Sequence, residues 1–135
     1  MNEKGKIKVL LVCYDPTTIQ PETRCLQLQA GLYIETASSN EEALVKLEKT
    51  KPDVIVCDFT GFRVSAQADG SKLVRTLRSK GDTTPFIVFS YEEDETELIA
   101  ELRELGAVGF VEKSGDPSTV FSNLKSCIVH INAHP

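Results

Sequence analysis

The sequence has no long hydrophobic run and no excess of basic charge. The apolar run nearest the N-terminus, Val9–Tyr14, has six residues, which is too short for a signal peptide or a membrane span. Lysine and arginine total 15 against 20 aspartates and glutamates, so the formal net charge is −5. A mildly acidic chain has no electrostatic attraction to nucleic-acid phosphates or anionic membranes. We therefore predict a cytoplasmic protein that binds no nucleic acid and no membrane.

Closely spaced cysteine pairs are also absent. No two of the four cysteines form a CxxC pair, so a zinc site or a thioredoxin-type site has no support. Cys13 and Cys57 lie in apolar runs, which predicts reduced and buried side chains. His130 and His134 fall in the last six residues, where a helix end or a tail is the simpler interpretation than a metal ligand.

The length and composition are those of one ordinary globular domain. The chain has 135 residues, of which 41% are hydrophobic and 26% are charged. The sequence shows no repeat, linker or low-complexity segment. We therefore predict a single domain over residues 1–135, with no effector domain.

Short apolar runs alternate with helical patterns along the whole chain. The predicted strands are Ile7–Cys13, Tyr33–Ala37, Val54–Cys57, Phe86–Phe89 and Val108–Val111. The predicted helices lie within Thr17–Gly31 and over Asn40–Thr50, Ser71–Ser79, Glu92–Leu105 and Asp116–Ile131. The central strands show no polar alternation, which indicates that both faces of the sheet are covered. The pattern predicts an α/β fold: a doubly wound, five-stranded parallel sheet with helices on both faces.

Polar residues follow the ends of four predicted strands. They are Tyr14 with Asp15, then Asp58, Ser90 and Lys113. In a doubly wound sheet the carboxyl ends of the strands share one edge, where sites gather. A carboxylate can act as a nucleophile, a hydroxyl can donate to a phosphoryl oxygen, and a lysine can neutralise its charge. This set suits the handling of a phosphoryl group.

Five motifs, in order, make the chain resemble the receiver domain of two-component response regulators. The motifs are LLVCYDP (Leu10–Pro16), PDVIVCD (Pro52–Asp58), ADGSKLVRTLR (Ala68–Arg78), TPFIVFS (Thr84–Ser90) and GAVGFVEK (Gly106–Lys113). The resemblance covers essentially the whole chain and implies a flavodoxin-like fold with strand order 2-1-3-4-5. The ending, PFIVFS followed by GFVEKSGDPS, most resembles receiver modules of archaeal, methanogen-type sensor systems.

The resemblance implies a signalling role rather than a turnover enzyme, with slow self-dephosphorylation at most. Asp58 would accept a phosphoryl group from a sensor histidine kinase or a phosphotransfer protein. Ser90 and Lys113 would bind that group, and Phe110 would be the switch aromatic whose rotamer follows Ser90. The switch would reshape the face formed by the last two predicted helices and the strand between them, which would bind a downstream protein or a second copy of the chain.

The sequence departs from the family pattern where the family places two adjacent metal-binding acids. Aligned on Pro16, those positions hold Cys13 and Tyr14, and only Asp15 and Asp58 remain as acids. Magnesium prefers oxygen ligands, a thiol is a soft ligand, and a tyrosine phenol is neutral at neutral pH. We therefore expect Mg²⁺ as a possible cofactor with weakened binding, and no other cofactor.

Two further departures concern loops. Asp69 lies eleven residues past Asp58, which makes loop 59–70 four residues longer than usual, with Phe62 in place of the expected proline. Ser114 stands where proline usually follows Lys113, so a cis bond there would be costly and that turn should differ.

Two other function classes stay open on the sequence alone. A pseudo-receiver would keep the fold and the interaction face without phosphorylation, which Cys13 and Tyr14 favour. In it Lys113 would only pair with Asp58, and Ser90 and Phe110 would be structural. An unrelated flavin or nucleotide binder has only Thr17 and Thr18 in its favour, without a glycine-rich loop.

Overall fold

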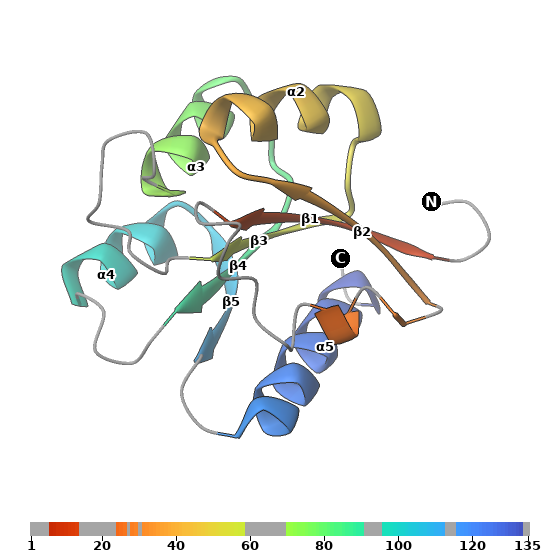
Figure 1. Ribbon diagram of the computed structural model, residues 1–135. Coiled ribbons are helices and arrows are strands. Elements are labelled where there is room, and N and C mark those ends of the chain that lie inside the picture. The colour runs from red at the N-terminus through yellow and green to blue at the C-terminus, as the bar shows by residue number, and fades with distance from the viewer. Residues whose placement is uncertain are drawn as a thin grey trace.

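Five parallel strands form one sheet in the order β2-β1-β3-β4-β5 (Figure 1). The computed structural model describes residues 6–13, 24–26, 28–29, 31–58, 70–90, 96–112 and 116–133. The strands are β1 (Ile7–Cys13), β2 (Leu32–Ala37), β3 (Val54–Asp58), β4 (Phe86–Ser90) and β5 (Ala107–Glu112). The predicted sheet, its parallel pairing and its strand order are confirmed.

In the described part of the chain, four helices cover these strands, and the first three of them connect one strand to the next. They are α2 (Asn40–Thr50), α3 (Gly70–Ser79), α4 (Thr96–Glu104) and α5 (Pro117–Ala133). Residues 24–26 are also helical, within the first predicted helix. The first four residues of the predicted helix Glu92–Leu105 lie outside the described residues. No helix in the described ranges combines the length and the apolar character that crossing a lipid bilayer requires.

The structure corrects several predicted ends. Asp58, Ser90 and Glu112 are the last residues of their strands, whereas the sequence placed them just past the strand ends. The reason is that parallel pairing is made by backbone groups, so the ladder continues after the apolar side chains stop. β2 and β5 each begin one residue earlier than predicted, at Leu32 and Ala107.

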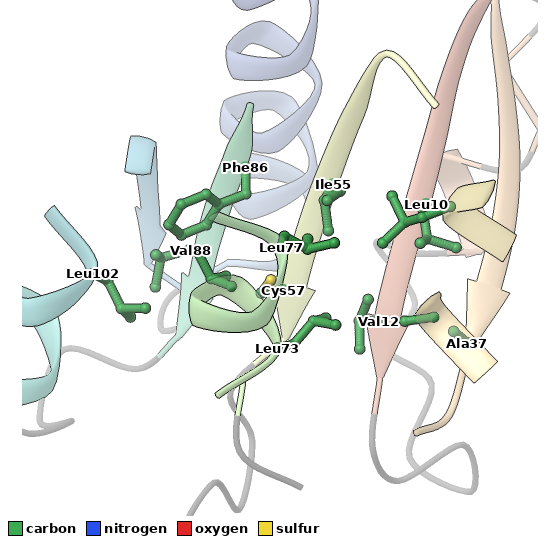
Figure 2. Close-up of a cluster of buried hydrophobic side chains, with 13 residues drawn as sticks. Leu10, Val12, Ala37, Ile55, Cys57, Leu73, Leu77, Phe86, Val88 and Leu102 are labelled. Carbon is green, nitrogen blue, oxygen red and sulfur yellow. The ribbon is translucent and has the colours of Figure 1, made fainter. Parts of the chain in front are cut away.

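Alternate side chains of the strands enter two hydrophobic clusters on opposite faces of the sheet. One cluster, which we call the α3–α4 cluster, joins Leu10, Val12, Ile55, Cys57, Phe86 and Val88 to buried leucines of α2, α3 and α4. Figure 2 shows these strand side chains pointing toward the side where α3 and α4 lie. The other cluster joins Val9, Leu11, Val56 and Phe89 to Leu26 and to α5. The strands lack polar alternation because both of their faces are buried.

Side-chain caps fix the starts of two helices. Ser39 is the N-cap of α2, and its Oγ accepts a hydrogen bond from the backbone N–H of Glu42 at 3.1 Å. At α5, Asp116 accepts hydrogen bonds from the Ser118 hydroxyl and from the backbone N–H of Thr119. Both caps agree with the predicted helix starts, which were Asn40 for α2 and Asp116 for α5.

Arg78 joins three segments near the starts of β4 and β5. From the last turn of α3, its Nε donates to the carbonyl of Leu105 at 2.9 Å, and its Nη1 donates to the carbonyls of Asp82 at 2.8 Å and Thr84 at 3.2 Å. Its guanidinium carbon also lies 5.4 Å from the ring centroid of Phe86. One side chain therefore holds together the end of α3, the segment before β4 and the turn between α4 and β5.

Candidate functional site

The carboxyl ends of β1, β3, β4 and β5 lie side by side. Cys13 of β1 is the register partner of Asp58, and Asp58 is the register partner of Phe89 in β4. Phe89 in turn pairs with Val111 of β5. These four residues form one row across the sheet, which we call the acceptor row. The row brings the predicted phospho-acceptor next to Cys13, the residue that departs from the family pattern.

The next row holds Ser90, and the other predicted phosphoryl-binding residue, Lys113, follows this row in the sequence. Ser90 is the register partner of Glu112, and Lys113 is the residue after Glu112. Neighbouring strands of a sheet lie about 4.8 Å apart, so the backbones of Asp58 and Ser90 are close neighbours. The side chains of Asp58 and Ser90 lie outside the described part of the structure, as do Tyr14, Asp15, Lys113, Ser114 and the loop 59–69.

The acceptor row lies near the carboxyl ends of strands whose side chains are buried. Cys13 is 8% exposed, and Cys57, which precedes Asp58, is 0% exposed, as predicted for both. Phe89 and Val111 are also buried. The backbone at Asp58 is therefore held by paired neighbours on both sides and by a rigid, close-packed interior beneath it. Such support holds the backbone of Asp58 in a fixed place.

The described residues do not assemble a magnesium site. Among them, no group of three or more histidine, cysteine, aspartate or glutamate side chains could hold a metal ion. At the end of β1 the described residue next to Asp58 is Cys13, whose thiol is a poor ligand for Mg²⁺. The two predicted acids, Asp15 and the side chain of Asp58, lie outside the described part of the structure.

Phe110, the predicted switch aromatic, occupies a half-buried position on β5. Its side chain packs against the α3–α4 cluster. The guanidinium carbon of Arg103, in the last turn of α4, lies 4.4 Å from the centroid of the Phe110 ring. This distance is within the range of a cation–π contact. The aromatic ring thus contacts both the hydrophobic core and the charged end of an exposed side chain.

The sequence did not point to Arg103 or to Arg78. A basic residue in the last turn of a helix is expected on electrostatic grounds alone, so Arg103 carried no separate signal. Both arginines contact segments that only the packed fold brings near them: Arg103 reaches β5, and Arg78 reaches Leu105 across 27 positions of sequence. Periodicity and motif spacing contain no information on such contacts.

Comparison with known proteins identifies relatives across most of the chain. The chain is 30% identical over 121 residues to the alkaline phosphatase synthesis transcriptional regulatory protein PhoP of Bacillus subtilis, covering 90% of this chain and 48% of PhoP. It is 30% identical over 107 residues to the response regulator MprA of Mycolicibacterium vanbaalenii, covering 79% of this chain and 44% of MprA. The chain therefore spans about half the length of the curated relatives that it matches.

Solved structures show the same architecture. The chemotaxis response regulator CheY4 of Vibrio cholerae aligns with a TM-score of 0.68 at 29% identity, covering 90% of this chain and 98% of that one. The response regulator domain of Thermotoga maritima CheB aligns with a TM-score of 0.74 at 24% identity, covering 96% of this chain and 98% of that one. The profile of the response regulator receiver domain matches residues 9–125. This chain belongs to the response regulator receiver domain family.

Proposed function

We propose that this receiver domain accepts a phosphoryl group on Asp58 from a sensor histidine kinase or a phosphotransfer protein. The observation that carries the proposal is the placement of Asp58 and Ser90 at the carboxyl ends of adjacent parallel strands, with Lys113 next to the end of β5. These are the residue types that a phosphoryl acceptor site needs, at the edge of the sheet where sites of this fold gather.

Each residue has a chemical role in the proposed transfer. A carboxylate oxygen of Asp58 attacks the phosphorus of a phosphohistidine; the new O–P bond forms as the N–P bond breaks, and the imidazole nitrogen keeps the bonding electron pair. The Lys113 ammonium neutralises charge on the phosphoryl oxygens, and the Ser90 hydroxyl donates a hydrogen bond to one of them. The domain is a switch rather than a turnover enzyme, with slow self-dephosphorylation at most.

The test is incubation of the chain with acetyl phosphate and Mg²⁺, followed by intact-mass measurement. The expected result is the gain of one phosphoryl group by the wild-type chain and none by Asp58→Asn. A wild-type mass that stays unmodified over a long incubation would overturn phosphorylation at Asp58. That outcome would support the alternative, a pseudo-receiver that signals through protein contacts alone.

The position of Cys13 favours the alternative, and it also supports a proposal about magnesium. We expect weak Mg²⁺ binding because a thiol replaces an oxygen ligand in the acceptor row, leaving Asp15 and Asp58 as the acids. Titration with Mg²⁺, followed by NMR shifts, should show weaker binding than Cys13→Asp, which adds an oxygen ligand. Binding by the wild-type chain as tight as that of Cys13→Asp would contradict this expectation.

The proposed output is a protein-binding face on α4, β5 and α5. β5 is an edge strand, and Val108 on β5 and Val129 on α5 are 50% and 44% exposed. Exposed apolar side chains beside an unpaired strand edge suit a downstream protein or a second copy of the chain. We propose a cytoplasmic location and no role for nucleic acid or membrane in this domain. The likeness to archaeal methanogen-type modules stays a prediction, since the relatives named above are bacterial.

A further inference from the structure

Phe110 is held from two sides by chemically different groups. Its ring packs against the α3–α4 cluster, and the guanidinium of Arg103 lies 4.4 Å from the ring centroid. Phe110 is half-buried, whereas Arg103 is exposed. The ring is therefore in contact with apolar side chains and with a cation that remains in water. A cation beside an aromatic ring is attracted by the negative face of the ring, and an arginine is the more common partner.

The backbone around Arg103 fixes where the guanidinium can reach. The carbonyl of Arg103 accepts a hydrogen bond from the N–H of Gly106 at 3.0 Å, in the turn that ends α4. Gly106 has a φ of +98°, a conformation that glycine adopts readily, so the turn leads directly into β5. Arg78 binds the carbonyl of Leu105 in the same turn at 2.9 Å. The end of α4 is thus anchored to α3 through Arg78 and continues directly into β5, so the fold places Arg103 beside Phe110.

We propose that Arg103 is a positioning residue for the switch, because its guanidinium stabilises Phe110 in the ring position seen here. This inference rests on the proposed function, in which Phe110 is the switch aromatic. A cation–π contact at an exposed site shifts a two-state population about two- to fivefold. Arg103 sets the fraction of unphosphorylated chains that hold this ring position, and phosphorylation at Asp58 acts against that bias.

The first test uses the unphosphorylated chain, so it does not depend on phosphorylation. The chain is labelled with 4-fluorophenylalanine, and the Phe110 signal is assigned by its loss in Phe110→Leu. In Arg103→Met the ¹⁹F signal of Phe110 should move, with the populations of its ring positions changed about two- to fivefold. Arg103→Lys, which keeps a cation, should fall between Arg103→Met and the wild-type chain. A signal that is the same in Arg103→Met and the wild-type chain would overturn the proposal.

Arg75→Met is the matched control. Arg75 is an exposed arginine on α3, and its Nε lies 2.9 Å from a carboxylate oxygen of Glu101 on α4. Arg75→Met removes a charged contact to α4, the helix that carries Arg103, but it removes no contact with Phe110. The Phe110 signal should therefore stay in place. An equal movement of the signal in Arg75→Met and Arg103→Met would overturn the specific role of the Arg103 guanidinium. Urea midpoints of all variants show that each one is folded.

The second test links the ring to the switch. The rate of phosphorylation by acetyl phosphate is compared for the wild-type chain, Arg103→Met and Arg75→Met. A change of about two- to fivefold in Arg103→Met alone supports the proposal. Equal rates in all three chains would overturn the coupling of Arg103 to the switch. A wild-type chain that takes no phosphoryl group would overturn the proposed function, while the ¹⁹F result still decides the role of Arg103 at the ring.

Discussion

The Sγ atom of Cys127 in α5 lies so close to Gly109 in β5 that a Cβ atom at position 109 would overlap it. Gly109 does not have a positive φ, so the close approach of the cysteine, and not the backbone conformation, requires glycine there. The two residues mark the place where α5 packs directly on the last strand. Burial raises the pKa of the Cys127 thiol, because a charged thiolate would lose its hydration there.

Gly109→Ala should destabilise the domain. The new methyl group would overlap Cys127 and move α5 away from β5, at a cost of about 1–3 kcal/mol, as is usual for overpacking. Urea unfolding measures the change. Gly109→Ala combined with Cys127→Ala should recover most of the loss, because the second change removes the sulfur. Additive losses in the double variant would contradict the proposed contact.

Replacement of Arg78 should be more harmful than replacement of a surface arginine. Arg78→Met leaves three carbonyls without their donor and should lower the free energy of unfolding by about 2–3 kcal/mol. Arg78→Lys should recover only part of this, because one ammonium cannot reproduce the planar fork of donors. Arg75→Met, which breaks an exposed ion pair, should cost less than about 1 kcal/mol. Equal costs at positions 75 and 78 would refute this expectation.

The free energy of unfolding should fall in acid, because the Glu42 carboxylate in the first turn of α2 becomes protonated. The backbone N–H of Ser38 donates to Glu42 at 2.8 Å, and with the Ser38 hydroxyl and Lys46 it holds the pKa of Glu42 below its ordinary value of 4.5. A lowered folded-state pKa means that the contribution is complete above about pH 4.5 and is lost as pH falls through the folded-state value. Urea midpoints measured from about pH 6 to about pH 3 should decline.

Glu42→Gln should flatten that decline. Glu41→Gln, one position earlier in the same turn, controls for the loss of one negative charge near the helix start. If the two variants had the same pH dependence, the hydrogen bonds from Ser38 would not be its source. Asp116 should add to the same acid loss, because the hydroxyl of Ser118 and the N–H of Thr119 lower its pKa.

The cap of α2 can be tested separately near neutral pH. Ser39→Ala removes the oxygen that accepts the N–H of Glu42 and should cost about 1 kcal/mol. Ser39→Asp supplies another acceptor and should stay near the wild-type stability. Thermal or urea unfolding measures both. A Ser39→Asp chain as unstable as Ser39→Ala would show that the side-chain acceptor is not what matters at this position.

The sequence predicted the fold wherever a local signal marks an element. The predicted ranges Ile7–Cys13 and Asn40–Thr50 are those of β1 and α2, because an apolar run and an N-cap mark their ends. The strand ends at Asp58, Ser90 and Glu112 were each one residue short in the prediction. Side-chain polarity was the guide there, while backbone pairing decides where a strand ends.

The candidate site could be predicted in outline for a similar reason. Parallel strands end at one edge, so residues after or at those ends come together whatever their distance in sequence, as Cys13, Asp58 and Ser90 do. The contacts of Arg103 with Phe110 and of Cys127 with Gly109 could not be predicted. They depend on how far each helix sits above the sheet and how it is rotated, which no spacing rule specifies.

The three hydrogen bonds of Arg78 also bear on how the domain opens locally. One of them joins the last turn of α3 to Leu105 in the turn between α4 and β5, and the other two join it to the segment before β4. The Arg75–Glu101 ion pair also joins α3 to α4. Helices linked in this way should exchange their amide hydrogens as one cooperative unit, a foldon, rather than one after the other. In Arg78→Met, exchange at Gly106 and in the last turn of α3 should speed up together, while the buried amides of β3 keep their slow exchange.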